Sequence, residues 1–303
     1  MSRFGANAAL LGAAAIWGGG FIAQADAMRG VGPLWFTVLR FGLAAAAMLP
    51  LVLAERRSAG RRFDRHDGMA LLAMGVAFTA ASLLQQFAIT RTSVTHVGFL
   101  TGLYVLFVPL LGAALLRQGP HGLVLLAASM ALGGTWLIGG GLAGLNGGDG
   151  LAVGCALGFA AQILLVDHVV RRTGRPGTAV LVQSLICAGL TLPAALSLET
   201  LSVQALPAIT PALLFAGVMS GGIAFMLQAV GQRGTAPSVA AVILMSESLF
   251  AALLAVLLLG ERLPPAGWLG CGLLFASLVL AQIGQGHSAP AHPAGEAPSD
   301  RLG

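Results

Sequence analysis

Ten apolar runs, each about as long as a lipid bilayer is thick, occupy most of this chain of 303 residues. A helix needs roughly 20 apolar residues to cross about 30 Å of hydrocarbon. Charged residues make up 9% of the sequence, against about 25% in soluble proteins, which is too few to cover a water-facing globule. The sequence therefore predicts an all-α polytopic membrane protein. Its spans are expected near residues 6–25, 33–54, 68–88, 94–116, 121–140, 150–167, 178–196, 210–230, 237–259 and 265–283.

The basic residues do not form a patch of the kind that binds nucleic acid. The formal net charge is +5, but the 16 basic residues are scattered between long apolar runs. A nucleic-acid-binding domain instead gathers its basic side chains on one face. The three cysteines lie inside apolar runs and form no C-x-x-C motif, so neither a disulfide nor a metal site is indicated. The triplet Gly18-Gly19-Gly20 favours a bend or close helix packing and lacks the spacing of a phosphate-binding loop. No nucleic-acid partner and no cofactor are predicted.

The arginines are distributed unequally between the two sides of the predicted membrane. Cytoplasmic loops carry an excess of basic residues in membrane proteins. If the N-terminus is cytoplasmic, twelve arginines fall on the cytoplasmic side, three fall on the outer side, and Arg40 lies inside a span. This distribution predicts a multi-pass protein with both termini in the cytoplasm. The outer three are Arg29, Arg91 and Arg262.

An offset of 143 residues aligns the two halves of the chain. Each half contains five spans, so the second half enters the membrane from the opposite side, and the arginine-rich loops exchange sides accordingly. Many secondary transporters share such an inverted repeat, and they bind substrate near the midplane between the halves. The sequence predicts one repeat over residues 6–142, a second over 148–284, and a disordered cytoplasmic tail over 285–303. Aligned pairs are Arg40 with Gln183, Gln85 with Gln228, and Tyr104 with Glu247.

Several short motifs, in this order and spacing, resemble the drug/metabolite transporter superfamily in its EamA-domain branch of ten-helix exporters. They are Ala15-Ile16-Trp17-Gly18-Gly19-Gly20-Phe21, Leu39-Arg40-Phe41, Gly98-Phe99-Leu100-Thr101-Gly102-Leu103-Tyr104, Ser246-Glu247-Ser248 and Leu259-Gly260-Glu261-Arg262. The resemblance covers both halves and implies two EamA repeats around a central cavity. It also implies export of amino acids or other small metabolites across the cell inner membrane. Ser248 departs from the family pattern, which often has Pro at that position.

Glu247 lies about ten residues into the ninth predicted span, near the middle of the hydrocarbon. An ionisable side chain at this depth costs at least about 2.5–3.5 kcal/mol and should face the interior of the bundle. One interpretation is a group that binds and releases a proton during transport. The other is a structural carboxylate that accepts hydrogen bonds from Ser246 and Ser248.

Arg40 is the second charged residue inside a span, seven residues after Pro33. Its guanidinium has the geometry to bind a substrate carboxylate through two parallel hydrogen bonds. It could instead pair with Glu247 or cap carbonyl groups at a broken helix, and buried charges are usually paired in this way.

Polar side chains at helical spacing add further candidates for a cavity that binds amino and carboxylate groups. Such residues also serve as hydrogen-bonding contacts between helices, at about 0.6 kcal/mol each, and we expect about half of them to do so. The single Tyr and the aromatic content of 6% argue against an aromatic substrate. With Arg40 and Glu247, the candidates for the cavity are Trp17, Thr79, Ser82, Gln85, Thr101, Tyr104, Gln162, Gln183 and Gln228.

The leading hypothesis is a secondary exporter of amino acids or related metabolites that works by alternating access. Coupling to protons at Glu247 is one of the two interpretations left open for that residue. Efflux of drugs or toxic compounds is the alternative within the same family. An intramembrane enzyme is disfavoured because the six histidines lie at span ends, in loops or in the tail, and form no catalytic constellation. A receptor without transport is a third hypothesis. Transport of nucleotide sugars is disfavoured because Arg40 is the sole cation inside a span. The predicted partners are a small-molecule substrate and the lipid bilayer, and a monomer is compatible with these features.

Overall fold

The computed structural model describes residues 2–58, 63–116, 122–139, 146–259 and 262–287, and every regular element within them is helical. The first half contains α1 (Arg3–Gly18), α2 (Gly20–Ser58), α3 (Arg65–Ile89), α4 (Val94–Thr101), α5 (Tyr104–Leu116) and α6 (Gly122–Ile138). The second contains α7 (Gly147–Thr173), α8 (Pro176–Leu198), a 3-10 turn (Val203–Ala205), α9 (Leu206–Leu214), a π-helix (Phe215–Ala224), α10 (Phe225–Gln232), α11 (Pro237–Leu244), α12 (Glu247–Leu259) and α13 (Pro265–His287).

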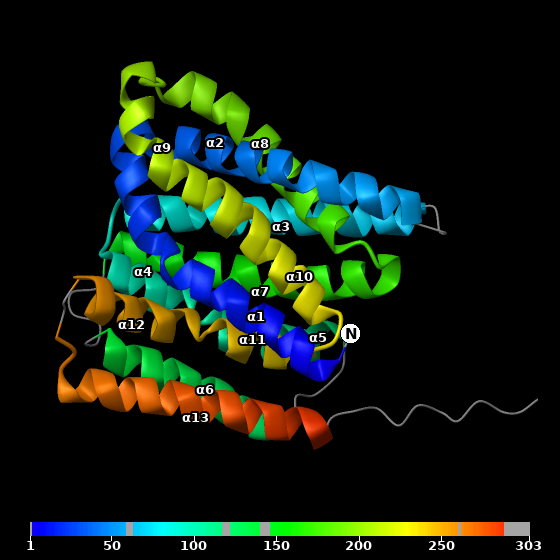
Figure 1. Ribbon diagram of the computed structural model, residues 1–303, viewed down its shortest axis with the longest axis vertical. Coiled ribbons are helices and arrows are strands. Elements are labelled where there is room, and N and C mark those ends of the chain that lie inside the picture. Colours follow the sequence, from blue (N-terminus) through cyan, green and yellow to red (C-terminus); the bar gives the residue numbers. More distant parts are fainter. Residues whose placement is uncertain (1, 59–62, 117–121, 140–145, 260–261, 288–303) are drawn as a thin grey trace, which may run out of the picture.

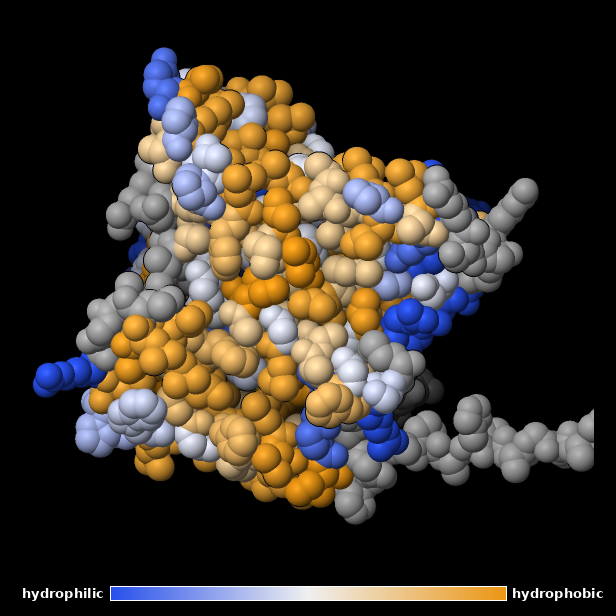
Figure 2. Space-filling view, viewed as in Figure 1, coloured by the Kyte–Doolittle hydropathy of each residue, from blue (hydrophilic) through white to orange (hydrophobic). Residues whose placement is uncertain are grey.

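The helices lie side by side with their axes roughly aligned (Figure 1). Within the described residues, eight stretches are long and apolar enough to cross a membrane, and α6 is a shorter apolar helix. Apolar side chains cover the middle of the visible face, while hydrophilic side chains gather toward its two ends (Figure 2). The molecule is therefore the all-α, polytopic membrane protein that the sequence predicts. We call the end of the bundle at which α1 begins and α7 ends the basic end, and we call the other the opposite end. The described arginines at the basic end are Arg3, Arg56, Arg65, Arg171, Arg172, Arg175 and Arg233.

The first predicted span is divided between α1 and the start of α2. The helix breaks at Gly19, which confirms the bend predicted at the glycine triplet. The chain then reverses at Gly32, whose φ of 75° lies in the left-handed region that favours glycine. A side chain at this position would also collide with the Glu199 carboxylate, because a Cβ would lie 2.8 Å from Oε2.

The two halves break their helices at matching positions. The fourth span is interrupted after Thr101 and resumes at Tyr104, and the ninth is interrupted after Leu244 and resumes at Glu247. Adding 143 to the bounds of α4 and α5 gives the bounds of α11 and α12 (94 to 237, 101 to 244, 104 to 247, 116 to 259). The same offset relates the first residues of α6 and α13 (122 to 265). The structure thus contains the repeat that the sequence indicates, down to its irregularities.

Two glutamates cap the helix pair α2 and α8 from opposite ends. At the basic end, Glu55 accepts hydrogen bonds from the backbone N–H groups of Gly177 (2.6 Å) and Thr178 (2.9 Å). At the opposite end, Glu199 accepts hydrogen bonds from the backbone N–H groups of Leu34 (3.1 Å) and Trp35 (3.0 Å), where α2 starts again after the reversal at Gly32. The first N–H groups of a helix lack partners within the helix, and the helix dipole favours an anion there. Adding 143 to Leu34 gives Gly177, so each half receives its cap from the other, as an inverted repeat requires.

Several boundaries differ from those predicted. The sixth span, predicted at 150–167, is α7, which runs from Gly147 to Thr173. It continues past its acidic residues because Asp149 takes part in the capping box that begins the helix and Asp167 pairs with Arg171 at 2.7 Å. Helix α13 extends through His287, into the segment predicted as a disordered tail, and residues 288–303 lie outside the described part. Pro50, Pro109 and Pro193 lie within helices that continue through them.

Candidate functional site

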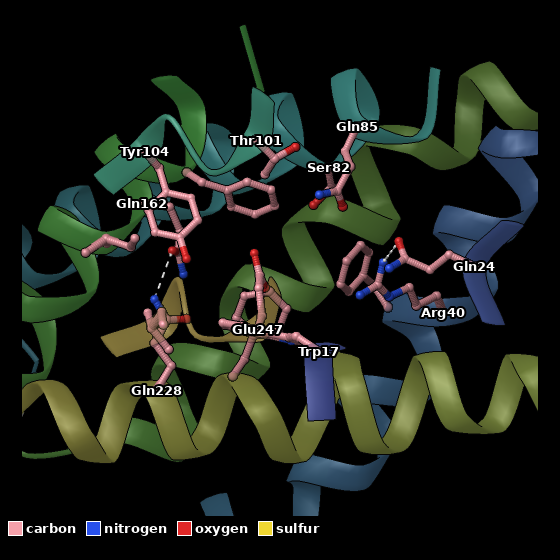
Figure 3. Close-up of a pocket in the computed structure, with 15 residues that line it drawn as sticks. Trp17, Gln24, Arg40, Ser82, Gln85, Thr101, Tyr104, Gln162, Gln228 and Glu247 are labelled. Atoms are coloured by element: carbon pink, nitrogen blue, oxygen red, sulfur yellow. Dashed lines mark hydrogen bonds between the residues drawn. The ribbon is translucent and has the colours of Figure 1, made fainter. Parts of the chain in front are cut away.

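A central cavity of about 60 Å³ lies between the two halves (Figure 3). Its walls come from α1 to α5 in the first half and from α7, α10, α11 and α12 in the second. This volume is well below the ~300–1,000 Å³ that is typical of small-molecule sites, so the cavity is narrow. The lining residues are Trp17, Gln24, Arg40, Phe41, Ser82, Gln85, Thr101, Tyr104, Phe159, Gln162, Ile163, Phe225, Gln228, Leu244 and Glu247.

Arg40 forms one pole of the cavity. Its guanidinium donates hydrogen bonds to the carbonyl oxygen of Ala216 (3.1 Å), to Gln24 Oε1 (2.7 Å) and to Ser220 Oγ (3.0 Å). It also lies over the ring of Phe41, 4.9 Å from the centroid. Ala216 and Ser220 belong to the π-helix Phe215–Ala224, which runs without a break from α9 into α10. One of the three roles predicted for Arg40 is to cap carbonyl groups at a broken helix; here it bonds to one carbonyl group, in a helix that is continuous.

No pair forms between Arg40 and Glu247, because the described residues include no ion pair for either. A guanidinium has five N–H donors, and the hydrogen bonds to described residues use three of them. Two donors remain on a cation that lines the cavity. Arg40 is thus both a structural contact and a cation available to a bound molecule.

Glu247 is the acidic residue of the cavity, and Figure 3 shows it between the Arg40 pole and the amide side chains. The residue is buried, and none of the described residues donates a hydrogen bond to its carboxylate. Ser246 was one of two hydroxyl partners predicted for it, but Ser246 Oγ donates to the carbonyl oxygen of Ile243 at 2.6 Å instead. Ser248 makes no such bond either. The two serines that the sequence offered as partners therefore do not satisfy the Glu247 carboxylate.

Amide side chains form the other pole. Gln228 donates from Nε2 to Gln162 Oε1 at 3.3 Å, and Gln162 donates from Nε2 to Gln183 Oε1 at 3.2 Å. Two atoms at this pole, Gln228 Oε1 and the Tyr104 hydroxyl, are buried without a hydrogen-bond partner among the described residues. Buried polar atoms in proteins nearly always have a partner, so these two are candidates to bind a polar group in the cavity.

Aromatic rings form much of the wall between the poles. Trp17, Phe41, Tyr104, Phe159 and Phe225 line the cavity, and Trp17 packs edge-on against Phe225 with 4.8 Å between ring centroids. The low aromatic content of the chain is therefore misleading as an argument against a substrate with a ring. Composition counts rings but not their location, and here five helices each place one ring on the same cavity.

Nine of the eleven candidates named from sequence line the cavity, and two do not. Thr79 donates its hydroxyl proton to the carbonyl oxygen of Gly75 at 2.7 Å, within its own helix. Gln183 lies behind Gln162, to which it is hydrogen-bonded. Sequence reasoning missed Gln24, whose Oε1 also accepts a bond from Gln86 Nε2 at 3.0 Å. An amide near the end of an otherwise apolar run was the available signal for Gln24. The apolar and aromatic lining residues carry no comparable signal.

Comparison with known proteins places this geometry in a family. Two segments, residues 5–140 and 146–282, match the model of the EamA-like transporter family. A protein of Archaeoglobus fulgidus named as an uncharacterized transporter is 28% identical over 283 residues, covering 93% of this chain and 87% of the relative. The transporter YwfM of Bacillus subtilis, likewise named as uncharacterized, is 27% identical over 278 residues, covering 88% and 90%.

A solved structure, titled "Crystal structure of protein", shares the fold. Its TM-score is 0.79 at 20% sequence identity, and the match covers 94% of this chain and 99% of the other. The two family segments together span nearly all the residues that the structure describes, and each contains one set of five spans. The chain belongs to the EamA-like transporter family, and it is a membrane transporter rather than an enzyme.

Proposed function

We propose that this transporter exports amino acids across the cell inner membrane by alternating access, with both termini in the cytoplasm. The observation that carries this proposal is the pair of unmatched charges on one cavity. Arg40 retains two N–H donors, and the Glu247 carboxylate has no partner among the described residues. A zwitterion presents a carboxylate to the first and an ammonium group to the second, and charge-assisted hydrogen bonds of this kind are the strong ones.

The aromatic wall favours an amino acid with an apolar or aromatic side chain. Trp17, Phe41 and Phe225 offer apolar surface beside the two charged groups. A cavity of about 60 Å³ is too small for such a molecule, so the helices must separate for it to bind. Alternating access supplies that separation on one side of the membrane at a time.

Glu247 is also the candidate for coupling to protons. Keeping an unpaired carboxylate charge at membrane depth is costly, whereas a protonated carboxyl group avoids that cost. Glu247 would then bind the substrate's ammonium group at one step of the cycle and a proton at another. This links substrate release to proton binding at one residue.

Counterflow in proteoliposomes tests the substrate class. Vesicles are loaded with an unlabelled compound, and uptake of trace radiolabelled L-leucine is measured. We expect exchange with neutral apolar and aromatic amino acids, weak exchange with L-glutamate and L-lysine, and none with amines that lack a carboxylate. Uptake of a radiolabelled amine into amine-loaded vesicles, without leucine uptake under any load, would instead support efflux of cationic drugs. Labelling of cysteines introduced at Ser58 and Ser202 tests the orientation, because the two should react from opposite sides of the membrane.

A further inference from the structure

A second and larger cavity lies beside the central one, toward the opposite end of the bundle. Its volume is about 330 Å³. It is lined by α4, the end of α6, α12 and the segment 262–264, which belong to both halves of the chain. Glu247 lines this cavity as well as the central one. Glu247 is therefore shared between the small central cavity and a larger cavity nearer the membrane surface.

The partition between the two cavities is thin. Trp17 lines the central cavity, whereas the next residue, Gly18, lines the second. A Cβ on Gly18 would lie 2.8 Å from the carbonyl oxygen of Glu247 and 2.9 Å from the backbone nitrogen of Ala251, so the backbones of α1 and α12 are in direct contact here. The contact falls beside the helix breaks at Gly19 and before Glu247. Both partners are therefore helix ends, which can shift without breaking a continuous helix.

The second cavity repeats the chemistry of the first. Phe99, Ile138 and Leu263 supply apolar wall, Thr95 and Ser248 supply hydroxyl groups, and the exposed Arg262 supplies a cation. Arg262 follows α12 on the side away from Glu247, so the cavity has a carboxylate-bearing residue toward the bundle centre and a guanidinium toward the surface. Near Arg262 the cavity thus offers a cation for a carboxylate, and it also offers hydroxyl groups for an ammonium group and apolar wall for a side chain.

We propose that this second cavity is an outer binding site for the same zwitterionic substrate, reached from the central cavity past the contact between Gly18 and α12. The inference rests on the proposed function. In it, the substrate leaves Arg40 and Glu247 in the central cavity, and its carboxylate is then bound by Arg262 nearer the membrane surface. Arg262 becomes a specificity-determining residue outside the central cavity.

Gly98 offers a way to fill the second cavity without disturbing the first. It lines the second cavity, and a Cβ built on it meets no heavy atom within 4 Å. Gly98→Leu should therefore occupy the space where the substrate is proposed to bind. Gly272→Leu is the matched control, because Gly272 is also helical, also meets nothing within 4 Å and lines neither cavity.

Exchange of radiolabelled L-leucine in proteoliposomes is the measurement. We expect Gly98→Leu to lower the exchange rate at least about tenfold and Gly272→Leu to leave it unchanged. We expect Arg262→Gln to raise the half-saturating leucine concentration on the outer side about tenfold, the effect of losing a hydrogen bond to a charged group. Arg91→Gln is the control for charge, since Arg91 is an exposed arginine outside both cavities.

Three outcomes separate the proposals. If wild-type protein exchanges no amino acid, the proposed function fails. If the wild type exchanges leucine and the two leucine variants behave alike, the outer site is wrong. If Gly98→Leu retains exchange but loses transport driven by a pH gradient, the cavity carries protons rather than substrate, and the outer site is again wrong.

A smaller substitution keeps the test decisive if Gly98→Leu does not fold. In Gly98→Cys, a membrane-impermeant thiol reagent should block leucine exchange from the outer side, and excess unlabelled leucine should slow that block. The wild type serves as the control, because Cys155, Cys187 and Cys271 are buried. Reaction at the introduced cysteine without any protection by leucine would overturn the outer site.

Discussion

The two halves of this transporter share one scaffold and differ in the chemistry they bring to the cavity. Their helices break at positions 143 residues apart, and each half caps a helix of the other with a glutamate. Yet the cation Arg40 corresponds to the neutral Gln183, and the acid Glu247 corresponds to the neutral Tyr104. The comparison shows that symmetry is kept where it supports the exchange of conformations and lost where the cavity must distinguish the two ends of a substrate.

Replacing Glu247 removes the acid that distinguishes the second half and should have the largest effect. Glu247→Gln keeps the shape of the side chain, and no described hydrogen bond is lost, so the protein should still fold. We expect transport driven by a pH gradient to be abolished. Flux in proteoliposomes across a range of external pH is the measurement, compared with Tyr104→Phe, which alters the cavity at the equivalent position without removing an acid. Rates equal to wild type at every pH would contradict proton coupling at Glu247.

Arg40→Gln gives the first half the residue that the second half carries at Gln183. Three buried acceptors, on Ala216, Gln24 and Ser220, would lose a charged donor. Hydrogen bonds to charged groups contribute about 1.5–3 kcal/mol each, so we expect both weaker substrate binding and a lower unfolding temperature. Counterflow and thermal unfolding in detergent measure the two effects.

The control for this prediction is Gln183→Ala, which removes an amide that lies behind the cavity wall and should affect stability more than substrate affinity. An Arg40→Gln variant that binds substrate normally, with only its unfolding temperature lowered, would assign Arg40 to a structural role alone.

The two capping glutamates test the symmetry itself. Glu55→Gln and Glu199→Gln each replace a carboxylate that accepts from two backbone N–H groups, and losing such a cap costs about 1 kcal/mol. We expect similar losses in unfolding temperature but opposite changes in conformation. Glu55→Gln should favour opening at the basic end, and Glu199→Gln at the opposite end. Side-specific labelling of cysteines placed in the cavity measures this, and equal labelling patterns in both variants would contradict it.

The sequence predicts the scaffold well because membrane thickness sets the length of each span. Most observed helices begin and end within a few residues of the runs read from hydropathy, and the bend at Gly19 follows from a glycine triplet. The breaks after Thr101 and Leu244 are different. No proline lies within either break. Gly102 of the first break packs against Met245 of the second, a contact between the two halves that a single run of residues does not reveal.

The cavity is harder to predict for the same reason. A polar residue in a span can be recognised from sequence because it is costly there, and nine of the eleven candidates do line the cavity. Gln24 reaches the cavity because the break at Gly19 redirects the start of α2, and the rings meet because helices from both halves converge. Neither fact is local in the sequence. Thr79 shows the converse, since its hydroxyl is satisfied within its own helix.

The smallest expected effects separate residues that line the cavity from those that pack helices. Thr79→Val removes a hydroxyl that donates to Gly75 within α3, and Ser82→Ala removes one from the cavity wall one turn along the same helix. We expect Thr79→Val to leave the half-saturating leucine concentration unchanged and Ser82→Ala to raise it about threefold, the effect of a weak neutral hydrogen bond. Because both changes lie on α3 and remove one oxygen each, any shared effect reports on the helix rather than on the substrate. A larger change for Thr79→Val than for Ser82→Ala would mean that α3 turns a different face to the substrate during transport.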